Sequence, residues 1–328
     1  MQTFIQSALF HPNMAQEQAR YREEIRERYG LDDETFTDRL RENWAGYVFI
    51  IPTFIAFTGL FYYPILRGVM MTFTDTQLGE PGQFVGLENY IWVVTNDLFV
   101  YAFALTIGFV AGTTFLQLAL GLLAALLLNE LREAAKDWVG ALIMSPYFSA
   151  PLAGGVIWMW FLDNDFGFVV KAFGIIGVDP PSFLATGMWP FISLIVAQTW
   201  HDYAYSAIIY AAAIASIPKE QYEAAAQSGA NRLQRFRDVT VPRLLIPTIV
   251  ILSLRTAWNI AEFSQPFALT GGGPGTRTMI LSILTYRVAF VDNNFARAYT
   301  IGMAMVLLSM TAAVIYVKAI DEEENLYV

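Results

Sequence analysis

Long runs of apolar residues alternate with short polar segments along the chain. Four runs contain no charged residue, at positions 44–63, 98–128, 139–162 and 298–317. Two further apolar blocks are interrupted, 182–215 by His201 and Asp202, and 244–269 by Arg255 and Glu262. A helix needs about 20 apolar residues to cross the hydrocarbon core of a bilayer. The pattern therefore predicts six membrane spans, at roughly 45–73, 98–129, 138–162, 187–215, 244–269 and 296–318.

The composition supports an all-α integral membrane protein. Of the 328 residues, 55% are hydrophobic and 15% are charged, whereas a soluble domain carries about 25% charged residues. The net charge of −9 disfavours a nucleic-acid partner, because binding to phosphates requires a basic surface. The chain has no cysteine, which excludes a disulfide framework, thiol catalysis and a zinc-thiolate site.

Charged residues outside the predicted spans indicate the domain organisation and the orientation. Residues 1–44 form a strongly charged segment that lacks the apolar core of a signal peptide. The predicted transmembrane domain covers residues 45–320, and residues 321–328 form a tail. Segments on the side of the termini carry 14 of the 20 Lys and Arg residues, and the opposite loops carry 4. The positive-inside rule therefore predicts a multi-pass protein of the cytoplasmic (inner) membrane with both termini cytoplasmic.

The loop between the fourth and fifth predicted spans carries signals for a short helix. Pro218 suits the first turn of a helix, and Glu220 and Glu223 favour its positively polarised end. Three alanines follow, and Gly229 can end the helix. These signals predict a helix at about 219–230 that lies parallel to the membrane. Its small cross-section would fit a groove on a partner, although an ordinary amphipathic loop helix is equally compatible.

This loop resembles the EAA loop of ABC importer permeases. The resemblance lies in Glu223-Ala224-Ala225, in Gly229-Ala230, and in Phe236 and Val241-Pro242. In that family the loop is the helix that docks into the cytoplasmic ATPase. The resemblance implies an ATPase-coupling role for Glu220, Tyr222, Glu223, Ala224, Ala225, Ser228, Gly229 and Ala230. Ser228 is a departure, because carbohydrate-type members usually have Asp there.

A second motif narrows the resemblance to the MalF-type carbohydrate branch. Residues Gly271, Gly272, Gly273 and Pro274 are similar to the external loop of these sugar permeases, as are residues 86–90 after the first span. The glycines do not form a phosphate-binding loop, because no Lys follows them. The resemblance implies a transport subunit that is not an enzyme and has no cofactor of its own. The implied partners are a second homologous permease, two ATPase subunits that bind ATP and magnesium, an extracytoplasmic sugar-binding protein and membrane lipid.

Polar residues inside the fourth and fifth spans form two matching stripes. The stripes consist of Gln198, His201, Asp202 and Tyr205, and of Arg255, Trp258, Asn259 and Glu262. Each set has the spacing i, i+3, i+4, i+7, which covers one face of a helix. Aromatic rings combined with hydrogen-bonding groups suit a sugar. The family resemblance also places substrate contacts of the maltose-type permease on these eight positions.

The stripes also allow other interpretations. Arg255 could pair with Asp202 or Glu262 and simply hold the helices together, or it could bind an anionic ligand of the glycerol-phosphate type. A proton-coupled secondary transporter would use Asp202, His201 and Glu262, but it leaves the helix at 219–230 unexplained. An intramembrane enzyme would use His201 and Asp202, but it lacks a suitably spaced nucleophile. A metal site is not expected, because adjacent helical residues point about 100° apart.

One compositional feature is independent of these motifs. The chain contains 16 Arg and only 4 Lys, and its aqueous segments are acidic. This balance resembles that of salt-adapted haloarchaeal proteins, whose surfaces avoid lysine.

The most concrete expectation from the sequence is a permease subunit of an ATP-driven, binding-protein-dependent sugar importer that works by alternating access.

Overall fold

The computed structural model describes residues 20–21, 24, 28, 44–77 and 79–324, and its regular elements in these ranges are helices. The expected charged N-terminal segment and the end of the tail lie almost entirely outside the described residues. Two compact units are present, Met1–Leu66 and Arg67–Val328. In the first unit, α4 (Trp44–Phe57) continues through a π-helical turn, η1 (Thr58–Tyr62), into α5 (Tyr63–Met71), which ends in the second unit.

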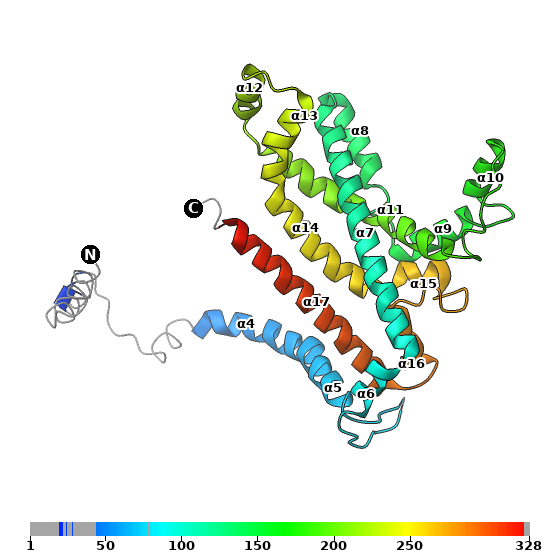
Figure 1. Cartoon of the computed structure of the whole chain (residues 1–328). Coiled ribbons are helices and arrows are strands. Elements are labelled where there is room, and N and C mark those ends of the chain that lie inside the picture. Colours follow the sequence, from blue (N-terminus) through cyan, green and yellow to red (C-terminus); the bar gives the residue numbers. More distant parts are fainter. Residues whose placement is uncertain (1–19, 22–23, 25–27, 29–43, 78, 325–328) are drawn as a thin grey trace, which may run out of the picture. The chain divides into compact units, whose positions relative to one another are not determined.

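The second unit contains the remaining helices (Figure 1). They are α6 (Glu88–Thr95), α7 (Asp97–Glu130), α8 (Glu133–Met144), α9 (Pro151–Phe161), α10 (Phe168–Ile175), α11 (Trp189–Ala215), α12 (Lys219–Gln227), α13 (Arg232–Arg235), the π-helical η2 (Phe236–Thr240), α14 (Val241–Ala261), α15 (Ser264–Thr270), α16 (Leu281–Phe290) and α17 (Phe295–Glu324).

Four described helical segments are long and apolar enough to cross a membrane. They are Trp44–Met71, Asp97–Glu130, Arg232–Ala261 and Phe295–Ala319. These segments confirm the prediction of an all-helical protein with long apolar helices. The predicted span 187–215 corresponds to α11, which has 27 residues and carries several polar side chains in its middle. The number of spans stays a prediction.

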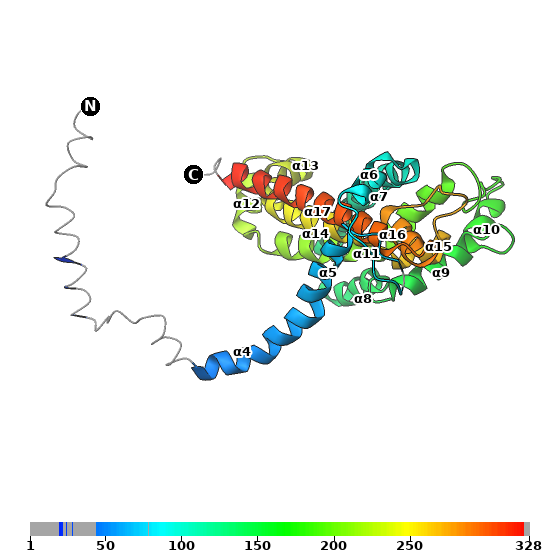
Figure 2. The same cartoon turned by 90° about the horizontal axis from the view of Figure 1, so that it is seen from below.

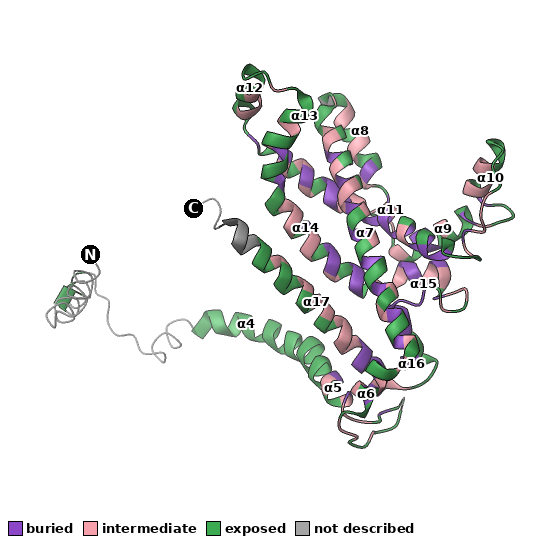
Figure 3. Ribbon diagram, viewed as in Figure 1, coloured by how far each residue is buried: buried purple, intermediate pink, exposed green. Residues whose placement is uncertain are grey.

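The centre of the second unit is the packing of α7 against α11. Buried positions concentrate along these two helices in Figure 3. Many of the buried α7 residues are small or carry a hydroxyl group, and Gly108 and Gly112 approach Phe191 and Ile195 on α11 closely. Small residues let helix backbones come together, which is how helices associate in a membrane. The α7–α11 pair therefore provides a rigid support for the other helices.

Helix α14 packs on both α7 and α11, and α17 runs beside α14 and α16 (Figures 1 and 2). The α14–α17 contact includes a hydrogen bond of 3.0 Å between the hydroxyls of Thr256 and Tyr316. Because α14 lies between the central pair and α17, its inner face is turned towards the polar residues of α11.

Two predicted spans are divided by breaks in the helix. In the block 138–162, α8 ends at Met144 and α9 begins at Pro151, with Pro146 in the intervening turn. Proline cannot donate a backbone hydrogen bond, which weakens a helix at this point and favours the break. In the block 244–269, α14 ends at Ala261, and Glu262 is extended with ψ 124°.

The second break is stabilised by Glu262 itself. Its carboxylate Oε1 accepts the backbone N–H of Gln265 at 3.3 Å, and its carbonyl oxygen accepts the hydroxyl of Ser282 at 2.6 Å. The expected helical arc from Arg255 to Glu262 therefore does not hold for Glu262, which lies beyond the end of α14. Broken helices are tolerated at membrane depth where protein groups satisfy the freed backbone, and transporters build binding sites at such breaks.

The packing of α9 on α15 predicts that alanine substitution is harmful at Gly155 and tolerated at its neighbour Gly154. A Cβ on Gly155 would lie 2.7 Å from both the Cβ of Ala268 and the carbonyl oxygen of Gln265, whereas a Cβ on Gly154 meets side chains only at 3.5 Å or more. We expect Gly155→Ala to destabilise the protein by about 1–3 kcal/mol, as overpacking does. Gly154→Ala gains the same helix propensity and should leave stability nearly unchanged. Thermal unfolding of the two variants in detergent measures the difference, and equal midpoints would contradict this packing.

Candidate functional site

The structure brings the two predicted polar stripes together through an ion pair between α11 and α14. Arg255 Nη1 lies 3.2 Å from Asp202 Oδ2, and Arg255 Nη2 donates a hydrogen bond of 2.8 Å to the backbone carbonyl of Asp202. Arg255 is 2% exposed and Asp202 is 8% exposed. Charges buried to this degree persist only when they are paired and hydrogen-bonded. The pair therefore joins α11 to α14.

Three aromatic rings enclose the Arg255 guanidinium. Its Cζ lies 4.4 Å from the ring centre of Tyr205, 5.2 Å from that of Trp258 and 5.9 Å from that of Tyr147. Cations are attracted to the negative faces of aromatic rings at such distances. The rings of Tyr205 and Trp258 meet edge to face at 5.1 Å. We call Tyr147, Tyr205 and Trp258 the aromatic platform.

His201 connects the same cluster to the break before α9. Its Nδ1 lies 2.8 Å from Asp202 Oδ1, and its Nε2 donates to the carbonyl oxygen of Ser149 at 3.0 Å. Gln198 donates a further hydrogen bond of 2.8 Å to Asp202 Oδ2. The Asp202 carboxylate thus interacts with His201, Gln198 and Arg255 at once. Within the described ranges, the structure contains no group of three or more acidic, His or Cys residues that could hold a metal ion.

Asn259 faces a different neighbour from the rest of its stripe. Its side-chain amide is 1% exposed and donates to Thr114 Oγ1 at 3.0 Å and to Gln117 Oε1 at 3.1 Å, both on α7. These contacts are hydrogen bonds between helices of the kind that stabilises membrane bundles. The structure therefore places the Asn259 side chain in the interface between α14 and α7.

The accessible part of the site is smaller than the eight predicted residues. Gln198, His201, Asp202, Arg255 and Asn259 are all buried. Trp258 is 46% exposed, and Tyr205, Tyr147 and Glu262 are partly exposed. A ligand would therefore meet the aromatic platform and the Glu262 carboxylate first. The buried ion pair lies behind them.

Sequence reasoning missed two residues of this region, Tyr147 and Gln265. Tyr147 lies in the turn between Pro146 and Pro151, and this proline spacing was the available signal. Gln265 is fully buried on α15, and neither its amide oxygen nor its nitrogen has a hydrogen-bond partner among the described residues. Its amide faces Gly154, as does His201. Buried polar groups without partners cost about 1–3 kcal/mol each, so Gln265 adds an unpaired amide to the polar residues around His201.

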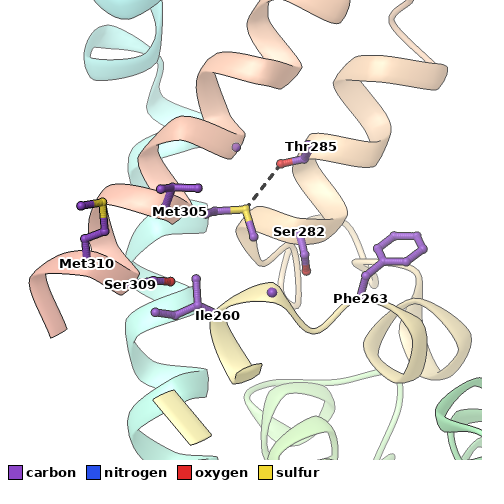
Figure 4. Close-up of a pocket in the computed structure, with 10 residues that line it drawn as sticks. Ile260, Phe263, Ser282, Thr285, Met305, Ser309 and Met310 are labelled. Carbon is purple, nitrogen blue, oxygen red and sulfur yellow. Dashed lines mark hydrogen bonds between the residues drawn. The ribbon is translucent and has the colours of Figure 1, made fainter. Parts of the chain in front are cut away.

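A cavity lies elsewhere in the second unit, between α14, α16 and α17 (Figure 4). Its volume is about 470 Å³, and its lining includes Phe263, Met305 and Met310. Thr285 donates a weak hydrogen bond to the sulfur of Met305 at 3.8 Å. None of the eight predicted site residues lines this cavity. Since its lining carries no charge and few hydrogen-bonding groups, we assign the candidate site to the polar cluster.

The predicted coupling helix is α12, and it is three residues shorter than expected. It begins at Lys219 and ends at Gln227, because Gly229 adopts φ +84°. The amides of Gly229 and Ala230 donate to the carbonyls of Ala226 and Ala225 at 3.0 Å, which is the Schellman arrangement. A glycine suits this left-handed position because it has no Cβ.

One face of α12 packs on the protein and the other is exposed. Tyr222 forms a hydrogen bond of 2.9 Å with Thr240, the last residue of η2. Glu220, Glu223 and Ala224 are exposed. The helix is thus fixed from behind and presents a smooth acidic face to the outside.

The glycine-rich loop after α15 is an ordered turn. Gly271 ends α15 with φ +57°, and a Cβ on Gly272 would lie 2.7 Å from Met279 Cε. Thr278 donates to the carbonyl oxygen of Gly273 at 2.8 Å. Pro274 follows with a cis peptide bond.

Comparison with known proteins identifies this arrangement of helices. Residues 49–322 match the family of the binding-protein-dependent transport system inner membrane component. The chain is 29% identical to the trehalose/maltose transport system permease protein MalF of Thermococcus litoralis, over 87% of this chain and 97% of that protein. It is 30% identical to the multiple sugar-binding transport system permease protein MsmF of Streptococcus mutans, over 85% of this chain and 96% of that one.

A solved structure shares the fold. The bacterial alginate ABC transporter, in complex with an alginate pentasaccharide-bound periplasmic protein, contains a chain that matches with a TM-score of 0.76 at 22% identity. The match covers 86% of this chain and 95% of that chain. The chain belongs to the family of binding-protein-dependent transport inner membrane components. It is therefore a non-catalytic permease subunit of an ABC importer, in which ATP binds to the ATPase.

The Arg255–Asp202 pair predicts strong coupling between two substitutions. We expect Asp202→Asn or Arg255→Met alone to destabilise the protein by about 3–5 kcal/mol, because each leaves a buried charge without its partner. The double variant should lose much less than the sum of the two. Thermal unfolding in detergent measures the coupling.

An exposed ion pair provides the control for that cycle. Arg237 and Asp238 lie 3.7 Å apart, and both are exposed. The same double-mutant cycle on this pair should give little coupling, because exposed pairs are screened by water. Additive losses at Arg255 and Asp202 would show that the ion pair does not hold α11 to α14.

Proposed function

We propose that this permease subunit translocates a carbohydrate, and that it works with a second homologous permease, two ATPase subunits and an extracytoplasmic sugar-binding protein. We also propose that the chain crosses the membrane six times and that both of its termini are cytoplasmic. The names of the related proteins support the substrate class, since they refer to trehalose/maltose, multiple sugars and alginate. The excess of Lys and Arg on one side of the predicted spans supports the orientation.

The observation that carries the carbohydrate assignment is the aromatic platform. Tyr147, Tyr205 and Trp258 converge on one point where α11, α14 and the break before α9 meet. Sugar rings have apolar faces that stack on aromatic side chains and hydroxyl rims that need hydrogen bonds. The partly exposed carboxylate of Glu262 is a strong acceptor for such hydroxyls.

The path from α12 to the site supports coupling to ATP hydrolysis. Tyr222 binds Thr240, η2 ends at Thr240, and α14 begins at the next residue. Helix α14 carries Arg255 and Trp258. A displacement of α12 by an ATPase would therefore be transmitted through η2 and α14 to the aromatic platform.

The proton-coupled alternative explains less of the structure. The Asp202 carboxylate, which would have to exchange protons, already interacts with Arg255, His201 and Gln198. A proton carrier of this kind would also have no use for the exposed face of α12.

Removing the Glu223 carboxylate should uncouple the transporter. In the reconstituted complex with its binding protein, we expect Glu223→Ala to lower substrate-stimulated ATPase activity about tenfold, equivalent to about 1.4 kcal/mol of lost coupling. Asp137→Ala is the matched control, because it removes an exposed carboxylate from α8 at the predicted cytoplasmic side. Equal activity in the two variants would contradict docking at α12.

The chain itself offers a test of the orientation, because it contains no cysteine. Gln227 at the end of α12 and Asp292 between α16 and α17 are both exposed. In intact cells, a membrane-impermeant maleimide should label Asp292→Cys and should label Gln227→Cys only after the membrane is opened. Labelling of Gln227→Cys from outside would overturn the orientation.

A further inference from the structure

We propose that the site of this chain selects sugars without a negative charge and rejects those that carry a carboxylate, sulfonate or phosphate group. The proposal deepens the proposed function and rests on it. It follows from which charges a ligand can reach. The accessible charge is a carboxylate, and the guanidinium that could bind an anion is occupied and buried.

Arg255 is the basic side chain on which an anionic ligand would depend. Residues 97–131, 145–161, 189–215 and 244–270 contain no other Lys or Arg. These ranges include the helices and breaks that surround the site. Any cationic contact from this part of the chain must therefore come from Arg255, or from a charged His201.

Both candidates are already engaged. Arg255 is 2% exposed, and its two Nη atoms contact Asp202. Its Nε has no hydrogen-bond partner among the described residues but is buried, and the ring centres of Tyr205 and Trp258 lie 4.4 and 5.2 Å from its Cζ. His201 is also buried, and its two ring nitrogens contact Asp202 and the carbonyl oxygen of Ser149. An anion could reach Arg255 only by moving the side chains that bury it, and it would then compete with Asp202 for the same positive charge.

Glu262 has the opposite character. Glu262 is partly exposed and lies beyond the end of α14. Its Oε1 accepts a hydrogen bond from the backbone N–H of Gln265. It is near enough to Asp202 and His201 to interact with them electrostatically. A ligand on the aromatic platform therefore meets a carboxylate with free acceptor capacity. Hydroxyl and ammonium groups donate to it, whereas a carboxylate or phosphate is repelled.

The test compares sugars of one skeleton that carry a neutral, an acidic or a basic group. The wild-type complex, embedded in nanodiscs without the binding protein, is probed by saturation-transfer NMR with three sets of sugars. Each set contains a hexose, its uronic acid and its 2-amino derivative, built on the glucose, galactose and mannose skeletons. Leaving out the binding protein removes its own selectivity. We expect at least one hexose to bind, with the matching uronate at least about tenfold weaker, a difference of about 1.4 kcal/mol.

Two variants test whether Glu262 causes the charge selectivity and whether the sugar binds at the aromatic platform. Glu262→Gln keeps a side-chain oxygen that can accept from the backbone N–H of Gln265, so this variant should fold normally. Because it removes the charge, it should reduce the difference in affinity between hexose and uronate. Trp258→Ala should abolish the signal of the bound sugar. A uronate that binds as tightly as its hexose would overturn the charge selectivity and leave the carbohydrate assignment standing. Absence of binding by every neutral, amino and acidic sugar would overturn the proposed function itself, and the inference with it.

Discussion

The buried ion pair between Arg255 and Asp202 is the interaction on which the candidate site depends. A guanidinium inside a membrane protein is tolerated only if its charge and its donors are satisfied. Here a single aspartate balances the charge and engages two of the three nitrogens, since its carboxylate lies 3.2 Å from Nη1 and its carbonyl accepts from Nη2. The third nitrogen, Nε, is buried without a hydrogen-bond partner among the described residues. The need to pair the buried charge of Arg255 therefore constrains the distance between α11 and α14. It also fixes Tyr205 and Trp258, because these rings cover the guanidinium.

The two helix breaks complete the site around this pair. The turn between α8 and α9 supplies Tyr147 and the Ser149 carbonyl, which accepts the hydrogen bond of His201. The break after α14 turns Glu262 out of the helix and leads into α15. In continuous helices, the backbone carbonyl of Ser149 would be occupied within its own helix and could not reach His201. The breaks are therefore part of the site, and their prolines and capping carboxylate are needed for its geometry.

The sequence predicted the long apolar helices, the short helix at α12 and the two polar stripes, because these depend on local periodicity and composition. It left open whether Arg255 pairs with Asp202, with Glu262 or with a ligand. It did not predict how the third and fifth apolar blocks divide. Prolines alone do not mark the breaks, because Pro247 lies inside the continuous helix α14 whereas Pro146 lies in a turn between helices. The neighbouring helices decide where a break can be satisfied. The sequence also did not predict the role of Asn259. Helical spacing predicts the face of the helix on which a residue lies but not which helix packs against that face. In the structure, Asn259 forms hydrogen bonds with Thr114 and Gln117 on α7.

The same contacts constrain how the proposed transport motion can proceed. Asp202 is bound to Arg255 on α14 and to His201 on its own helix, and His201 is bound to the backbone before α9. Separating α9, α11 or α14 would break a charged hydrogen bond away from water, which costs more than moving the three as one body. Helix α12 is joined to α14 through Tyr222 and Thr240. A push on α12 would therefore tilt the platform and its ion pair together, and access would change at the borders of this body rather than within it.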